Sequence, residues 1–143
     1  ADLRYVASKN VISEFKAIKN EEQRMVFLRT FWRQLDPTPE TPTNERLVEH
    51  MRRMRYTENN FSGMHGQEGS NTDKGRVYIQ YGPPDDIEYN TGGAGEKPYQ
   101  IWYYEKEGRF EFIFRDRRGI GVYELVHSTQ PGEIYNPSWR EEQ

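Results

Sequence analysis

Apolar side chains in the first part of the chain recur every three or four residues, which is the period of an amphipathic α-helix. The first such stripe predicts a short helix that ends near Lys19, and it consists of Val11, Ile12, Phe15 and Ile18. A second helix is expected to begin after Asn20, whose side chain suits the N-cap, and to end at Asp36 before Pro37. Its buried face is expected to hold Met25, Leu28, Phe31, Trp32 and Leu35.

A third apolar stripe follows the proline-rich connector and predicts a longer helix that reaches Phe61. Either Thr41 or Thr43 is expected to cap its start. The stripe consists of Leu47, Met51, Met54 and Phe61. On the water-facing side, Glu49 and Arg53 are four residues apart, a spacing that favours an ion pair along the helix.

The period changes to two after a glycine-rich stretch at residues 62–71, and a period of two indicates β-strands. Val77, Ile79 and Tyr81 alternate with Tyr78 and Gln80 and predict a first strand. Further strands are expected at residues 99–104, 109–115 and 120–127, with a short edge strand at residues 87–89. The strands before and after the loop 105–108 are expected to form a hairpin.

Helices followed by an antiparallel meander predict an α+β fold, with the N-terminal helices packed on one face of a sheet of three to four strands. A length of 143 residues suits one domain. We therefore expect a single domain, 1–143, which we divide into four parts. They are a helical part (1–61), a glycine-rich loop and motif (62–76), a sheet (77–127) and a docked C-terminal tail (128–143). The start at Ala1 leads us to expect a segment of a longer protein.

Aromatic residues make up 14% of the chain, and they crowd both faces of the strand at residues 99–104. Tyr99 and Tyr103 point to one face while Trp102 and Tyr104 point to the other. Each face therefore needs a cover. Either the tail residues Tyr135 and Trp139 fold back over one ring set, or that set forms an exposed surface that binds a partner.

Composition excludes several classes of chemistry. The absence of cysteine removes disulfides, thiolate metal sites and thiol nucleophiles. A net charge of −3 gives no overall electrostatic attraction for nucleic acid, and no apolar run is long enough to span a bilayer.

Residues 66–75 lack the sequence and context of a phosphate-binding loop. His50, His65 and His127 lack metal-ligand spacing, so we expect no metal and no cofactor.

Several unusual blocks resemble the GWxTD domain, and they follow one another in that family's order. They are residues 31–39, 41–45, 69–79, 81–85, 101–104, 112–116, 123–128 and 136–139. The motif itself runs from Gly69 to Asp73, with Ser70 at the position of the eponymous tryptophan. The resemblance covers most of the chain from Phe27 onward.

The resemblance implies a bacterial domain of unknown activity in larger envelope proteins of Bacteroidetes, associated with type IX secretion and gliding. A periplasmic or outer-membrane location is therefore expected. The resemblance supplies no catalytic residues. From the residue types we expect a structural motif that closes a turn at the start of a strand, with Arg76 paired to Asp73 or another nearby acidic side chain. Its members are Gly69, Thr72, Asp73, Gly75 and Arg76.

The function that these observations predict is a non-enzymatic interaction or structural domain that binds a protein partner or a neighbouring domain of its own chain. The candidate contact residues are Pro83, Pro84, Asp85, Trp102, Tyr104 and Arg117. Neither nucleic acid nor membrane insertion is expected. The alternative is a metal-dependent or hydrolase-like activity that uses His65, Asp73 or Asp85 on the loops.

Overall fold

The chain folds into two compact units, residues 1–56 and 57–143, which are described separately. The structure is a computed structural model that describes residues 3–38, 44–62 and 68–142. No helix among the described residues is both long enough and apolar enough to cross a membrane.

The first unit contains helices α1 (Lys9–Ala17) and α2 (Glu21–Gln34) and most of α3 (Glu45–Phe61). The predicted cap of α2 is confirmed, since the Asn20 side chain accepts the N–H groups of Glu22 and Gln23 at 2.8 and 3.2 Å. Trp32 is 5% exposed and packs beside the His50 ring, with their centroids 5.0 Å apart. Both rings are buried within the helical unit.

Helix α3 begins at Glu45, and its first turn is capped by Asn44, which accepts the Leu47 N–H at 3.0 Å. The predicted caps, Thr41 and Thr43, lie outside the described residues. The predicted ion pair on this helix is confirmed, because Arg53 Nε is 2.9 Å from a Glu49 carboxylate oxygen.

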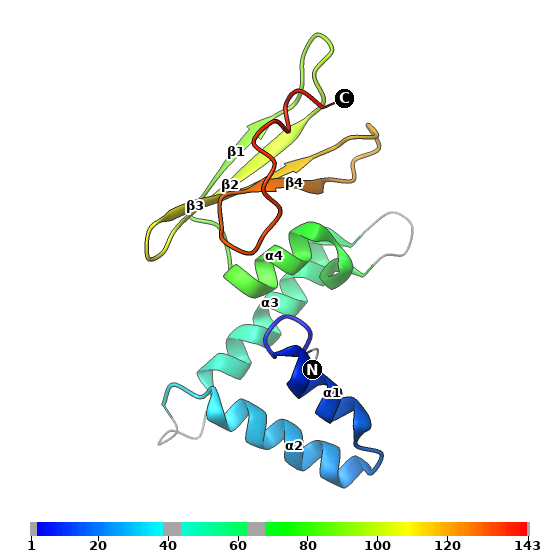
Figure 1. Cartoon of the computed structure of the whole chain (residues 1–143), viewed down its shortest axis with the longest axis vertical. Helices are drawn as coiled ribbons and strands as arrows, with labels where there is room; N and C mark the ends of the chain where they lie inside the picture. Colours follow the sequence, from blue (N-terminus) through cyan, green and yellow to red (C-terminus); the bar gives the residue numbers. More distant parts are fainter. Residues whose placement is uncertain (1–2, 39–43, 63–67, 143) are drawn as a thin grey trace. The chain divides into compact units, whose positions relative to one another are not determined.

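The second unit holds the last turn of α3, a short 3₁₀ helix η1 (Gly69–Asn71), helix α4 (Asp73–Tyr81) and one sheet (Figure 1). The strands are β1 (Asp86–Asn90), β2 (Tyr99–Glu105), β3 (Arg109–Arg115) and β4 (Glu124–Ser128). They pair antiparallel in the order β1-β2-β3-β4. The predicted α+β class with an antiparallel meander is confirmed.

The strand predicted at Val77–Tyr81 is wrong, because these residues form most of helix α4. Val77, Tyr78 and Ile79 are all buried, so the apolar alternation did not mark a one-sided strand. Val77, Tyr78 and Tyr81 lie on one helical face and pack against the rings of the sheet. The last strand also begins later than expected, at Glu124.

Both faces of the sheet are covered within this unit. On one side, which we call the helix face, Val77 and Tyr78 of α4 pack on a set of rings, joined by Phe61 from the end of α3. The rings are Trp102, Tyr104, Phe112 and Phe114. On the opposite side, which we call the tail face, Trp139 packs on Tyr99, Ile101, Ile113 and Val126. Figure 1 shows the C-terminal tail, in red, running across the sheet.

Candidate functional site

The motif residues Gly69 to Gly75 form the junction at which η1 ends and α4 begins. The Thr72 hydroxyl is the N-cap of α4: it accepts the Gly75 N–H at 3.0 Å and donates to the Gly69 carbonyl at 2.7 Å. One side chain therefore joins the end of η1 to the first turn of α4. The motif lies at the entry to a helix, whereas the sequence indicated the entry to a strand.

The two motif glycines allow backbone segments to approach within distances that a side chain would prevent. A Cβ atom on Gly69 would lie 1.9 Å from the Thr57 carbonyl oxygen, and one on Gly75 would lie 1.8 Å from the Gly69 carbonyl oxygen. Both obstructing atoms belong to the backbone and cannot rotate away. Glycine is therefore required at both positions by close contact.

Asp73 connects the start of α4 to the outer strand of the sheet. Its Oδ2 atom accepts the backbone N–H of Leu125, in β4, at 2.7 Å. The two residues are separated by 52 positions in the sequence. The carboxylate also lies in the first turn of α4, where the partial positive charge of the helix N-terminus stabilises it.

Ser70, the second residue of the motif, is 2% exposed. Its backbone N–H donates to the Glu58 carboxylate at 3.2 Å, which links η1 to the last turns of α3. The side chain at this position therefore points into the interior of the unit, where a change of volume affects packing.

Arg76 extends the junction toward the C-terminal tail. Its guanidinium makes two hydrogen bonds to the Glu133 carboxylate, at 2.7 and 3.1 Å, and Tyr81 donates its hydroxyl to the same carboxylate at 2.9 Å. Burial raises the pKa of Glu133, but the hydrogen bonds from Arg76 and Tyr81 outweigh it and hold this pKa below its usual value. Burial, together with Glu133, raises the pKa of Tyr81 to about 12. The acidic side chain that bonds Arg76 is thus Glu133 of the tail, whereas the Asp73 carboxylate accepts the Leu125 N–H.

A hollow of about 230 Å³ opens beside the junction. It is lined by Thr72, Asp73, Arg118, Val122, Tyr123 and Glu124. Next to it, the Lys74 ammonium lies 4.2 Å from the centre of the Tyr123 ring, and burial lowers the pKa of Lys74 to about 8. The Thr72 hydroxyl and an Asp73 oxygen bind the backbone, and Arg118 pairs with Glu124 at 3.1 Å, so these polar groups of the hollow already have partners within the domain.

Two of the predicted contact residues lie in the core. Trp102 and Tyr104 are 2% and 0% exposed, and the Tyr104 hydroxyl donates to the Gly82 carbonyl at 2.8 Å. An exposed surface made of these two rings is therefore not present. The predicted cover by the tail holds for Trp139, which packs edge-on against Tyr99 at 4.9 Å on the opposite face. It is wrong for Tyr135, which is 73% exposed and lies beside the His127 ring.

The remaining predicted contact residues lie at the surface or close to it. Pro83 and Pro84 lead from Gly82, which ends α4 with a φ of 85°, to the start of β1. Asp85 accepts the Glu105 N–H at 2.7 Å and donates its own N–H to the Tyr103 carbonyl at 2.8 Å. Arg117 is exposed in the turn after β3, 3.8 Å from Glu124. Pro83, Pro84 and Asp85 therefore lie together at the start of β1, whereas Arg117 lies in the turn after β3.

The residues named for a hydrolase-like or metal-dependent activity are not brought together in the parts of the chain that the structure describes. His65 lies outside those parts. Asp73 and Asp85 each accept a backbone N–H from a different strand. Among the described residues, no group of three or more histidine or acidic side chains is arranged to hold a metal ion.

Sequence reasoning missed the partners that complete the junction. Glu58, Leu125 and Glu133 contact motif residues from 12, 52 and 57 positions away. No local pattern marks such partners, because the pairing depends on how the sheet folds back on the helix. Sequence reasoning also did not identify Lys74 as a residue of the site. Its position between Asp73 and Gly75 of the motif could have indicated it.

Replacing Gly75 with alanine is expected to destabilise the second unit by about 1–3 kcal/mol, since the new methyl group collides with the Gly69 carbonyl. Gly93→Ala is the matched control, because nothing lies within 4 Å of its Cβ position. Urea unfolding followed by circular dichroism measures both. Equal midpoints for the two variants would contradict the close backbone contact.

Replacing Glu133 with glutamine is expected to lower stability by about 1–3 kcal/mol at neutral pH, since a charged acceptor of three hydrogen bonds is lost. Because the folded pKa of Glu133 is lowered, its contribution is complete above its ordinary pKa of 4.5 and is lost as the pH falls through the lowered value. The stability difference between wild type and variant, measured by urea titrations from pH 7 to pH 3, should therefore shrink as the pH falls below 4.5. As the control, Glu124→Gln removes an ion pair near the surface and should change stability by less than about 1 kcal/mol. A stability difference between Glu133→Gln and wild type that does not depend on pH would contradict the role of the Glu133 charge.

Comparison with known proteins places the chain in a family. The model of the GWxTD domain matches residues 1–142 of the 143. Neither the curated proteins nor the solved structures contain a match. The motif residues at the junction of η1, α4 and β4 are those by which the sequence resembles this family, and the matched region spans both units. The chain belongs to the GWxTD domain family.

Proposed function

We propose that this domain is a non-catalytic interaction module that binds an extended segment of another protein, or of a neighbouring domain of its own chain, along the outer edge of β1. The observation that carries the proposal is the difference between the two edges of the sheet. One edge is closed by the domain's own residues, and the other has no backbone partner among the residues that the structure describes.

The β4 edge is closed by two contacts from elsewhere in the unit. The Asp73 carboxylate accepts the Leu125 N–H, and the Ile134 carbonyl accepts the Ser128 N–H at 2.8 Å. At the other end of the sheet, β1 has a single neighbour, β2. Within the described parts of the chain, no strand or loop pairs with the outer side of β1. Alternate backbone groups of an edge strand point outward, where they can pair with an added strand.

The side chains of β1 indicate which segment would fit. Ile87 and Tyr89 lie toward the helix face, and Tyr89 is 67% exposed. Asp86 and Glu88 lie toward the tail face, beside Tyr103. The pKa of Tyr103 is raised by burial and then by the charges of Glu88 and Glu111, which outweigh the opposing charge of Arg109. The complementary segment therefore alternates basic and apolar side chains.

The same charges disfavour a second copy of this chain as the partner. If two β1 strands paired at their outer edges, acidic side chains of one would face acidic side chains of the other. Like charges that face each other across a strand pair are destabilising. A segment with lysine or arginine in register with Asp86 and Glu88 has no such penalty.

The predicted contact residues Pro83, Pro84 and Asp85 have a supporting role in this proposal. The two prolines restrict the backbone between α4 and β1, and Asp85 bonds to β2 through both its side chain and its N–H. The edge strand is therefore held in place before a partner binds, which lowers the entropy cost of binding.

The proposed cellular setting is a larger bacterial envelope protein, in the periplasm or at the outer membrane, in type IX secretion or gliding. This part of the proposal follows from the family resemblance described above. The open β1 edge is compatible with any location in which a partner segment is available, so the setting is tested separately from the binding mode.

Peptide binding tests the proposed edge. A ten-residue peptide that alternates lysine and valine is expected to bind, whereas the same peptide with glutamate for lysine is not. Glu88→Lys should weaken binding about tenfold or more, because it places like charges together. The controls are Glu141→Lys and Tyr135→Ala, which change exposed residues of the tail and should leave affinity within about twofold.

Site-specific photo-crosslinking in cells gives the second readout of the same proposal. A photoreactive residue at position 89 should capture a defined protein in the envelope fraction, and one at position 135 should not. Equal peptide affinity for Glu88→Lys and wild type, or equal binding of the basic and acidic peptides, would overturn the proposed edge site.

A further inference from the structure

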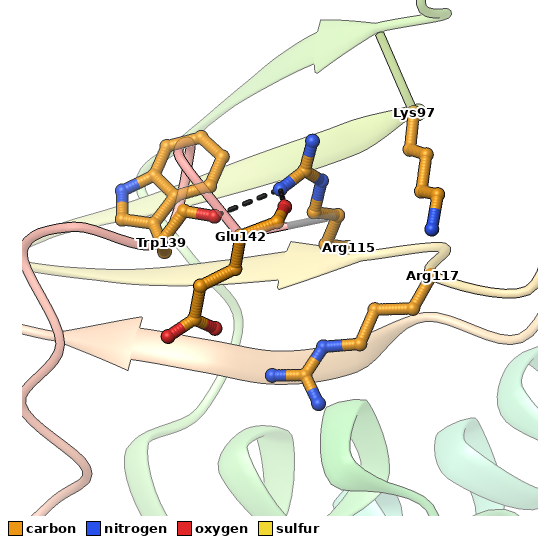
Figure 2. A pocket seen from close by; sticks show the side chains of 5 residues that line it. All are labelled: Lys97, Arg115, Arg117, Trp139 and Glu142. Atoms are coloured by element: carbon orange, nitrogen blue, oxygen red, sulfur yellow. Dashed lines mark hydrogen bonds between the residues drawn. The ribbon is translucent and has the colours of Figure 1, made fainter.

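A second hollow, of about 110 Å³, lies where the C-terminal tail crosses the end of β3. It is lined by Lys97, Arg115, Arg117, Trp139 and Glu142 (Figure 2). Three of these five side chains are cations and one is an anion. They come from the loop before β2, the end of β3, the following turn and the tail, so the fold gathers positive charge that is dispersed in the sequence.

Arg115 is the centre of this group. It is 5% exposed, and its Nη1 atom donates to the backbone carbonyls of Trp139 and Glu142 at 2.8 and 2.7 Å. Its Nε atom is buried and has no hydrogen-bond acceptor among the described residues. No carboxylate within that part of the chain forms an ion pair with it. A buried guanidinium without a counter-ion is costly, and an anion in the hollow would offset that cost.

The one acidic residue of the hollow does not supply that counter-ion. Glu142 accepts a hydrogen bond from the Asn136 amide at 2.9 Å, and Figure 2 shows its carboxylate pointing away from the Arg115 guanidinium. Lys97 makes no ion pair within the described residues, and Arg117 is 3.8 Å from its nearest carboxylate oxygen, on Glu124. The positive charge at the mouth of the hollow is therefore only weakly balanced.

We propose that this hollow binds a single oxyanion group, either a carboxylate or a phosphate. Arg115 provides a planar donor group held in place by the tail carbonyls, and Lys97 and Arg117 provide mobile charges at the mouth. At about 110 Å³ the hollow is smaller than the pockets of roughly 300 Å³ or more that enclose drug-sized ligands, which suits one small charged group. The proposal does not depend on the β1 edge.

The test is a titration of the 143-residue chain with inorganic phosphate and, separately, with acetate, at constant ionic strength set by sodium chloride. Nuclear magnetic resonance follows the Arg115 Nε–H and the Trp139 indole N–H. At least one of the two anions is expected to shift both signals in a saturable way. The anion that binds more tightly shows whether the hollow prefers a phosphate or a carboxylate.

Neighbouring arginines provide a matched pair of variants. Arg117→Gln and Lys97→Gln should each weaken anion binding about tenfold, because each removes a charge at the mouth of the hollow. Arg118→Gln removes the same charge one residue further on, where the side chain pairs with Glu124, and should change affinity by less than about twofold. Unchanged amide signals of β2 and β3 confirm that each variant is folded.

Two results would overturn the proposal. The first is the absence of a saturable shift with both phosphate and acetate. The second is an equal loss of affinity in Arg117→Gln and Arg118→Gln, which would show that the anions respond to general surface charge and not to this hollow.

Discussion

The second unit depends on how closely the backbone can pack where η1 meets α4. Gly69 and Gly75 bring three backbone segments into contact, and the Thr72 hydroxyl fixes the direction in which α4 leaves. With that direction set, the Asp73 carboxylate reaches the Leu125 N–H of β4. The buried face of α4 is then presented to the rings of the sheet. The residues that characterise the motif thus act as a structural connection between helix and sheet.

This connection also determines what the sheet leaves available. One face is covered by α4 and the other by the tail, and β4 is engaged by Asp73 and by the Ile134 carbonyl. The rings that suggested an exposed surface are used internally. Among the described residues, nothing pairs with the outer edge of the short strand β1, which carries acidic residues toward one face and Tyr89 toward the other. The proposed function follows from that remaining edge.

Local patterns predicted the elements well where one physical signal dominated. The Asn20 cap, the Glu49–Arg53 pair and the strands β2 and β3 were all evident from the sequence. Residues 77–81 were misassigned because α4 is buried on more than one side, so its apolar residues imitate the period of a strand. The contacts of Asp73 and Arg76 with Leu125 and Glu133 could not be predicted, since they join segments more than 50 residues apart.

The most direct test of this account is the hydrogen exchange rate of the Leu125 amide in wild type and in Asp73→Ala. If the carboxylate connects α4 to β4, this amide should exchange at least about tenfold faster in the variant, while the central amides of β2 and β3 keep their protection. Equal protection of the Leu125 amide in the two proteins would show that Asp73 does not hold the edge of β4, and would contradict the account.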